Sequence, residues 1–167
     1  MNFFKKIGMA ILFYALGFII NANMNYLFAS GGMSYIGYSI PSIIVMTVVL
    51  VAGGRMLRGE RLKKNHKGDE SEEKTIFNGD LKGKYSYVTK TKEFKLECIL
   101  SIVFGFIAVL SPVFEYAYLY SFPVLFSSAG NVFLVIFGLL LTPIYITALN
   151  AFTWVSAYNK AYKRKAY

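Results

Sequence analysis

Residues 98–118 read CILSIVFGFIAVLSPVFEYAY, and Glu115 is the only charged side chain among them. An α-helix rises 1.5 Å per residue, so this stretch reaches about 31 Å, close to the thickness of the hydrocarbon core of a bilayer. Three further apolar stretches of similar character cover about residues 7–28, 36–52 and 132–155. The sequence therefore predicts an all-α, polytopic membrane protein that forms a single domain of four transmembrane helices.

The overall composition points to the same class. Hydrophobic residues make up 56% of the 167 positions and charged residues only 16%, against about 25% in soluble domains. So few charges cannot cover the large relative surface of a small soluble fold. The single cysteine, Cys98, excludes an intrachain disulfide. The net charge of +9 is not accompanied by a base-stacking or groove-reading motif, so we expect no nucleic-acid partner.

The basic residues fall in three places only. Lys5 and Lys6 precede the first apolar stretch, twelve Lys or Arg residues lie in 55–97, and the tail holds Lys160, Lys163, Arg164 and Lys165. Together these are all 18 basic residues, and the connections 29–35 and 119–131 contain none. Since cytoplasmic loops carry the excess of Lys and Arg, we predict two helical hairpins with both termini cytoplasmic. A short chain with so one-sided a distribution of basic residues favours a bacterial plasma membrane.

A cleaved signal peptide is an alternative for the first stretch. Lys5 and Lys6 followed by the apolar run 7–20 match the first two regions of a secretory signal, and small residues at 29–31 offer a cleavage site. Cleavage would leave three spans. The apolar stretch continues to Phe28, which is longer than a signal requires and favours a span.

The segment 55–97 is predicted to be a basic cytoplasmic loop. Its first part can contact anionic headgroups or a partner, or can simply fix the topology; its basic residues are Arg55, Arg58, Arg61, Lys63, Lys64 and Lys67. Further along, Tyr85, Tyr87, Thr89 and Thr91 alternate with other residues. This period of two predicts a short strand or hairpin at the lipid surface.

Polar groups inside a membrane span are the best pointer to function that such a sequence offers. Glu115 is the one charged residue expected within a span, and Asn21 and Asn25 lie at a comparable depth on one face of the first helix. These three residues form a candidate intramembrane polar site. Either Glu115 binds a proton or cation in an outer polar cavity, or its side chain extends to the headgroups.

Small residues recur along the third span at helical spacing, namely Ser101, Gly105, Ala108 and Pro112. Because packing drives helix association in lipid, we expect this stripe to face other helices.

With one His and one Cys in the chain, we expect no catalytic site, metal or cofactor. The sequence favours a non-catalytic accessory subunit, transporter-associated or of the immunity type, that binds a membrane-protein partner through its small-residue stripes and its basic inner segment. A small homo-oligomeric transporter or channel that uses Glu115, Asn21 and Asn25 is the alternative.

Overall fold

The computed structural model of the protein describes residues 3–65, 76–77 and 79–163. Within these ranges the chain is all-helical and contains no strand. The elements are α1 (Phe3–Ser30), α2 (Tyr35–Asn65), α4 (Leu81–Lys90), α5 (Lys92–Tyr120), α6 (Phe122–Phe126) and α7 (Ala129–Lys163).

Four of these helices, α1, α2, α5 and α7, are long and apolar enough to cross a membrane. The all-α prediction with four candidate transmembrane helices is therefore confirmed. The helices extend beyond the predicted spans, because α2 continues to Asn65 and α5 already begins at Lys92. Both ends of the predicted 55–97 loop are therefore helical.

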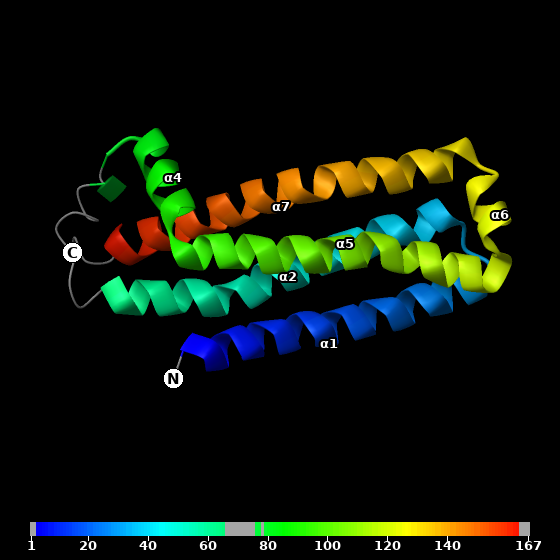
Figure 1. The fold of residues 1–167 in the computed structure, drawn as a ribbon, viewed down its shortest axis with the longest axis horizontal. Helices are drawn as coiled ribbons and strands as arrows, with labels where there is room; N and C mark the ends of the chain where they lie inside the picture. The colour runs from blue at the N-terminus through cyan, green and yellow to red at the C-terminus, as the bar shows by residue number, and fades with distance from the viewer. Residues whose placement is uncertain (1–2, 66–75, 78, 164–167) are drawn as a thin grey trace.

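The four long helices lie alongside one another as a bundle (Figure 1). α2 and α5 form its central pair, since each of them packs on the other and on both α1 and α7. α1 begins and α7 ends at the same end of the bundle (Figure 1), which we call the terminal end. The opposite end carries the α1–α2 turn and α6, and we call it the turn end.

The α1–α2 connection is tight because Gly32 adopts a left-handed conformation with φ +81°. The Met33 amide donates to the Phe28 carbonyl at 3.1 Å, and the Gly32 amide donates to the Ala29 carbonyl at 3.0 Å. This pair of bonds is the Schellman arrangement that ends helices, and glycine adopts its left-handed position without steric penalty. The Gly-rich turn thereby reverses the chain within a few residues.

The predicted strand over residues 84–91 is wrong, because this segment forms α4 and its capping residue. Asp80 caps the helix by accepting a hydrogen bond from the Gly83 amide at 3.0 Å. Val88 is fully buried, and Tyr85 and Tyr87 pack against the aromatic cluster of Phe77, Trp154 and Tyr158. The N-cap and this packing override the β propensity of the Tyr and Thr residues.

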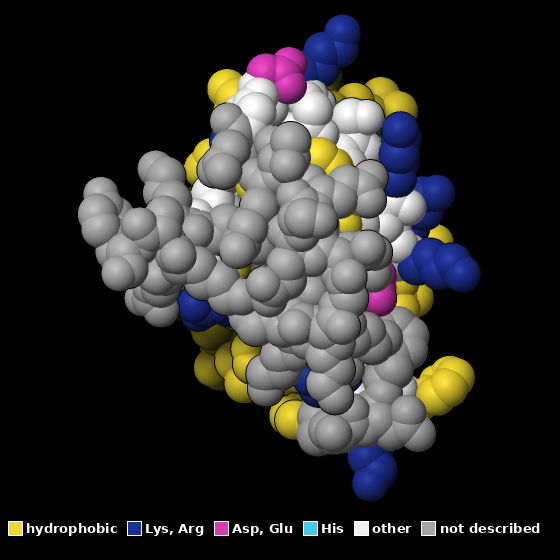
Figure 2. Space-filling view, turned by 90° about the vertical axis from the view of Figure 1, so that its left-hand side faces the viewer, with side chains coloured by type: hydrophobic (Ala, Val, Ile, Leu, Met, Phe, Trp, Pro, Cys, Tyr) yellow, Lys and Arg dark blue, Asp and Glu magenta, His cyan; other side chains and the backbone are white. Residues whose placement is uncertain are grey.

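The outside of the bundle is apolar. Phe133, Leu140 and Ile144 on α7 are each 65% exposed, and similar residues line α1 and α2. In water such a continuous apolar surface would be unstable, whereas a lipid bilayer covers it without cost. At the terminal end the character changes, and Lys and Arg side chains project around the rim (Figure 2).

Candidate functional site

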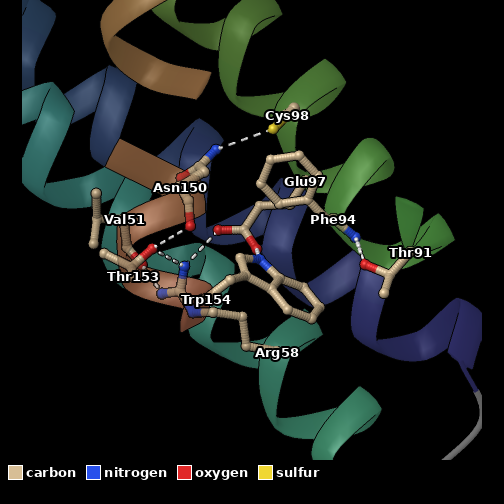
Figure 3. A network of polar contacts seen from close by, with 9 residues as sticks. All are labelled: Val51, Arg58, Thr91, Phe94, Glu97, Cys98, Asn150, Thr153 and Trp154. Atoms are coloured by element: carbon tan, nitrogen blue, oxygen red, sulfur yellow. Dashed lines mark hydrogen bonds and ion pairs between the residues drawn. The ribbon is translucent and has the colours of Figure 1, made fainter. Parts of the chain in front are cut away.

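Two polar clusters stand out among the described residues of the bundle, and the first lies toward the terminal end. Glu97 of α5 and Arg58 of α2 form an ion pair, with Nη1 of Arg58 2.7 Å from Oε1 of Glu97. Their side chains are only 5% and 0% exposed. Trp154 of α7 donates its indole N–H to the other carboxylate oxygen, Oε2 (Figure 3). Three of the four long helices therefore meet at one carboxylate.

The Arg58 guanidinium is held by more than this ion pair. Nη1 also donates to Oγ1 of Thr153 at 2.9 Å, and Nη2 donates to the Val51 carbonyl at 2.6 Å (Figure 3). Both oxygens of Glu97 accept bonds, so the charges are paired as well as hydrogen-bonded. A buried ion pair persists only when such bonds offset the loss of hydration. We call Arg58, Glu97, Thr153 and Trp154 the ion-pair cluster.

Two adjacent glycines make room for these side chains. A Cβ on Gly54 would lie 1.8 Å from Oε1 of Glu97, and one on Gly53 would lie 2.2 Å from the Tyr14 ring. Real atoms do not approach so closely, so any larger residue would displace the Glu97 carboxylate or the Tyr14 ring. The Gly53-Gly54 pair therefore allows the side chains of α5 and α1 to lie directly against the α2 backbone.

The second cluster lies toward the turn end and joins α1, α2 and α5. Asn21 and Asn25 both donate to Oγ of Ser42, at 2.6 and 3.0 Å. Ser111 donates to Oε1 of Glu115, and the Asn25 side chain lies close to that carboxylate. We call Asn21, Asn25, Ser42, Ser111 and Glu115 the amide cluster. The structure thus brings the three residues of the predicted intramembrane site into one region.

The amide cluster is incompletely satisfied. Oε2 of Glu115 and Oδ1 of Asn21 are buried without a hydrogen-bond partner among the described residues. A cavity of about 320 Å³ borders Glu115 and Ser111, and its other walls are apolar, formed by Phe18, Ile107, Leu110 and Phe114. The carboxylate therefore borders a largely apolar groove, and it retains an unused oxygen that could accept a proton or a polar partner.

The predicted small-residue stripe is used within the chain. All four of its members, Ser101, Gly105, Ala108 and Pro112, are buried on α5. A Cβ on Gly105 would lie 2.5 Å from Ile146 and 2.9 Å from Thr142, both on α7. The stripe therefore faces other helices of the bundle, with Gly105 against α7 and the Pro112 carbonyl bonded to Tyr38 of α2, and it is not available to a separate protein.

The basic residues predicted to contact headgroups or a partner lie in different environments. Arg55 is exposed, whereas Arg58 points inward to Glu97 and is not a headgroup contact in this structure. The side chains of Arg61, Lys63 and Lys64, and the whole of Lys67, lie outside the described residues. Arg55 is thus the member of the predicted run that the structure places on the surface.

Sequence reasoning missed Glu97 as a site residue. The predicted span began at Cys98, which assigned Glu97 to the loop. A signal was present, because Glu97 lies four residues before Ser101 and so continues the small-residue stripe by one helical turn. Arg58 had no comparable signal, since it is one of several basic residues on the same stretch. Among the described residues, no group of three or more His, Cys, Asp or Glu side chains could hold a metal ion.

Comparisons with protein-family models, with curated proteins and with solved structures find no match to this chain. The two clusters therefore have to be interpreted from their own geometry.

Proposed function

We propose that this protein is a non-catalytic integral membrane subunit that binds a membrane-protein partner. On this proposal the four helices form two hairpins in a bacterial plasma membrane, with the terminal end in the cytoplasm. The proposed contact is the basic run 55–67, apart from Arg58, whose charge is buried and paired with Glu97.

The observation that carries the proposal is the filled interior of the bundle. The ion-pair cluster occupies the space between α2, α5 and α7, and next to it the void among Leu50, Ile146 and Asn150 is too small for a water molecule. Larger cavities of about 670 and 320 Å³ open on the surface between two helices, and one of about 290 Å³ opens among α2, α5 and α7. A bundle with this interior offers its outside for binding, which favours a partner-binding role over conduction along its axis.

The charge distribution supports the proposed orientation. Every basic residue in the sequence belongs to the leader, to the segment 55–97 or to the tail. The described parts of these segments lie at the terminal end (Figure 1), which the positive-inside rule assigns to the cytoplasm. Impermeant thiol reagents can test this in a Cys98→Ser background: Ser128→Cys should react in intact cells, and Ser86→Cys only after lysis. The reverse pattern would contradict the orientation.

Purification from the native membrane tests the partner-binding role. The tagged chain in a mild detergent should retain a different membrane protein at fixed stoichiometry. The variant Arg61→Gln/Lys63→Gln/Lys64→Gln should lose most of this partner. The matched control Lys5→Gln/Lys6→Gln/Lys95→Gln, which removes as many charges from α1 and α5, should keep it. Recovery of the chain only as a monomer or a homo-oligomer would contradict the proposal.

A homo-oligomeric transporter or channel is the second candidate, and one observation favours it. Glu115 holds a buried oxygen that has no hydrogen-bond partner among the described residues and lies beside Asn25, an arrangement typical of a proton or cation site in a membrane. On this alternative the cation enters between α1 and α5 in an oligomer. The variant Glu115→Gln should then abolish proton- or cation-coupled flux in proteoliposomes, whereas Glu97 variants would act only through stability. Wild-type vesicles without flux would remove this candidate.

A further inference from the structure

An open groove lies between α2 and α7, toward the terminal end. Its volume is about 670 Å³, within the range of about 300–1,000 Å³ typical of ligand sites. From α2 it is lined chiefly by Val48, Val51, Ala52 and Arg55, and from α7 by Phe152, Ser156 and Lys160.

The lining of the groove changes from apolar to basic toward the terminal end, and it does so on both walls. α2 and α7 run parallel toward the terminal end (Figure 1), so residues later in each helix lie nearer to that end. On α2 the lining passes from Val48 and Val51 to Arg55, and on α7 it passes from Phe152 to Lys160. Each wall spans twelve residues of helix, from 47 to 58 and from 149 to 160, which is eleven rises or about 16 Å. This is the depth of one leaflet, half of the hydrocarbon core of about 30 Å.

At the terminal end of the groove, the described lining residues carry positive charge without an acidic residue among them. Arg58 also borders the groove, but its charge is paired with Glu97. Arg55 and Lys160 are both exposed and lie on opposite walls. No acidic residue is among the described residues that line the groove. An occupant that carries a negative charge at one end and an apolar chain at the other would complement both parts.

We propose that this groove binds one anionic phospholipid of the leaflet that faces the terminal end. Its phosphate lies between Arg55 and Lys160, and one acyl chain follows Val51, Val48 and Phe152 toward the bilayer centre. A second copy of the chain fits less well, because a symmetric contact would bring the same two cations of each copy together. This lipid site goes beyond the partner-binding role and does not rest on it.

Native mass spectrometry of the full chain in mild detergent tests the site, with phosphatidylglycerol and phosphatidylcholine as the probes. Wild type should retain one phosphatidylglycerol in preference to phosphatidylcholine. The variant Arg55→Gln/Lys160→Gln should bind phosphatidylglycerol about thirtyfold more weakly, because two basic contacts are lost. The control Lys92→Gln/Lys95→Gln removes the same charge from exposed positions on α5 and should bind as wild type does. Equal weakening in both variants, or equal binding of the two lipids, would overturn the proposal.

A second variant tests the apolar part of the groove without touching the charges. Ser156 is exposed on the α7 wall, so Ser156→Phe should fill the groove, preserve the fold and abolish phosphatidylglycerol retention. Glycerol phosphate, which has the headgroup chemistry but no acyl chain, should not displace the lipid. Retention of the lipid by Ser156→Phe would overturn the site, as would displacement by glycerol phosphate. A photo-crosslinker at position 152 that captured a second copy of the chain in place of lipid would also overturn it.

Discussion

Glu97 and Glu115 lie on the same helix, 18 residues or about 27 Å apart, and their surroundings differ in almost every respect. The Glu97 carboxylate faces an arginine and an indole N–H, and both of its oxygens accept hydrogen bonds. The Glu115 carboxylate faces Ser111 and Asn25, and one of its oxygens has no partner among the described residues. The carboxylate that the sequence marked as intramembrane is the less constrained one, and the carboxylate that holds three helices together had been assigned to a loop. A completely paired charge inside a span therefore indicates a role in stability, whereas an incompletely paired one indicates a role in function.

The largest effect should come from Glu97→Gln. The substitution keeps the shape of the side chain but leaves Arg58 as a buried cation without a counter-ion, at a cost of about 3–5 kcal/mol. The free energy of unfolding in mixed micelles, followed by Trp154 fluorescence, measures the loss. The double variant Arg58→Met/Glu97→Leu should recover most of it, because both charges are then removed. If the double variant were no more stable than Glu97→Gln, the ion pair would not explain the loss.

Gly54→Ala should give the next largest effect. The new Cβ would overlap Oε1 of Glu97, which is tied to Arg58, and overpacking of this kind costs about 1–3 kcal/mol. Gly59→Ala on the same helix is the matched control, since nothing lies within 4 Å of a Cβ at that position. The control should be neutral or stabilising by up to about 1 kcal/mol, because alanine favours helix. Equal thermal shifts in the two variants would contradict the close approach at Gly54.

Ser42→Ala should have a smaller effect at the amide cluster. The hydroxyl accepts from both Asn21 and Asn25, and interhelical hydrogen bonds in membranes contribute about 0.6–2 kcal/mol. Ser39→Ala is the control on the same helix, because the buried Ser39 hydroxyl has no partner among the described residues. Denaturant titration should show a loss for Ser42→Ala and no loss for Ser39→Ala. The opposite order would mean that the hydroxyl of Ser42 is not the acceptor.

Glu115→Gln should change stability least, by less than about 1 kcal/mol. An amide oxygen can still accept from Ser111, and no buried cation is left behind among the described residues. The same unfolding titration used for Glu97→Gln makes the two results directly comparable. A loss at Glu115 as large as that at Glu97 would remove the distinction between the two clusters.

The sequence predicted the fold class correctly, but it predicted one of the shorter segments wrongly. The four apolar stretches predicted four helices that could span a membrane, because a run of about 20 apolar residues has few other stable environments. The segment 84–91 was predicted wrongly, because its alternating Tyr and Thr residues carry a weak β preference. The Asp80 cap and the burial of Val88 outweigh that preference. A short polar segment has too weak a periodicity to determine its own structure, so its neighbours determine it.

Of the candidate sites, too, one could be predicted from the sequence and another could not. Glu115, Asn21 and Asn25 could be predicted because polar residues within apolar runs are conspicuous, and the structure brings them together. The groove between α2 and α7 could not be predicted, because it depends on which two helices become parallel neighbours. The sidedness of the membrane remains a prediction from charge alone.

The amino-acid sequence alone suffices to predict that this chain is helical and apolar enough to cross a membrane four times. Hydropathy and helix length are local properties, so no tertiary information was needed for that conclusion. Which charges are enclosed depends on the packing of the helices, because the pairing of Arg58 with Glu97 joins residues 39 positions apart on different helices. Burial and pairing depend on neighbours in space, and nothing in the sequence around either residue specifies that neighbour.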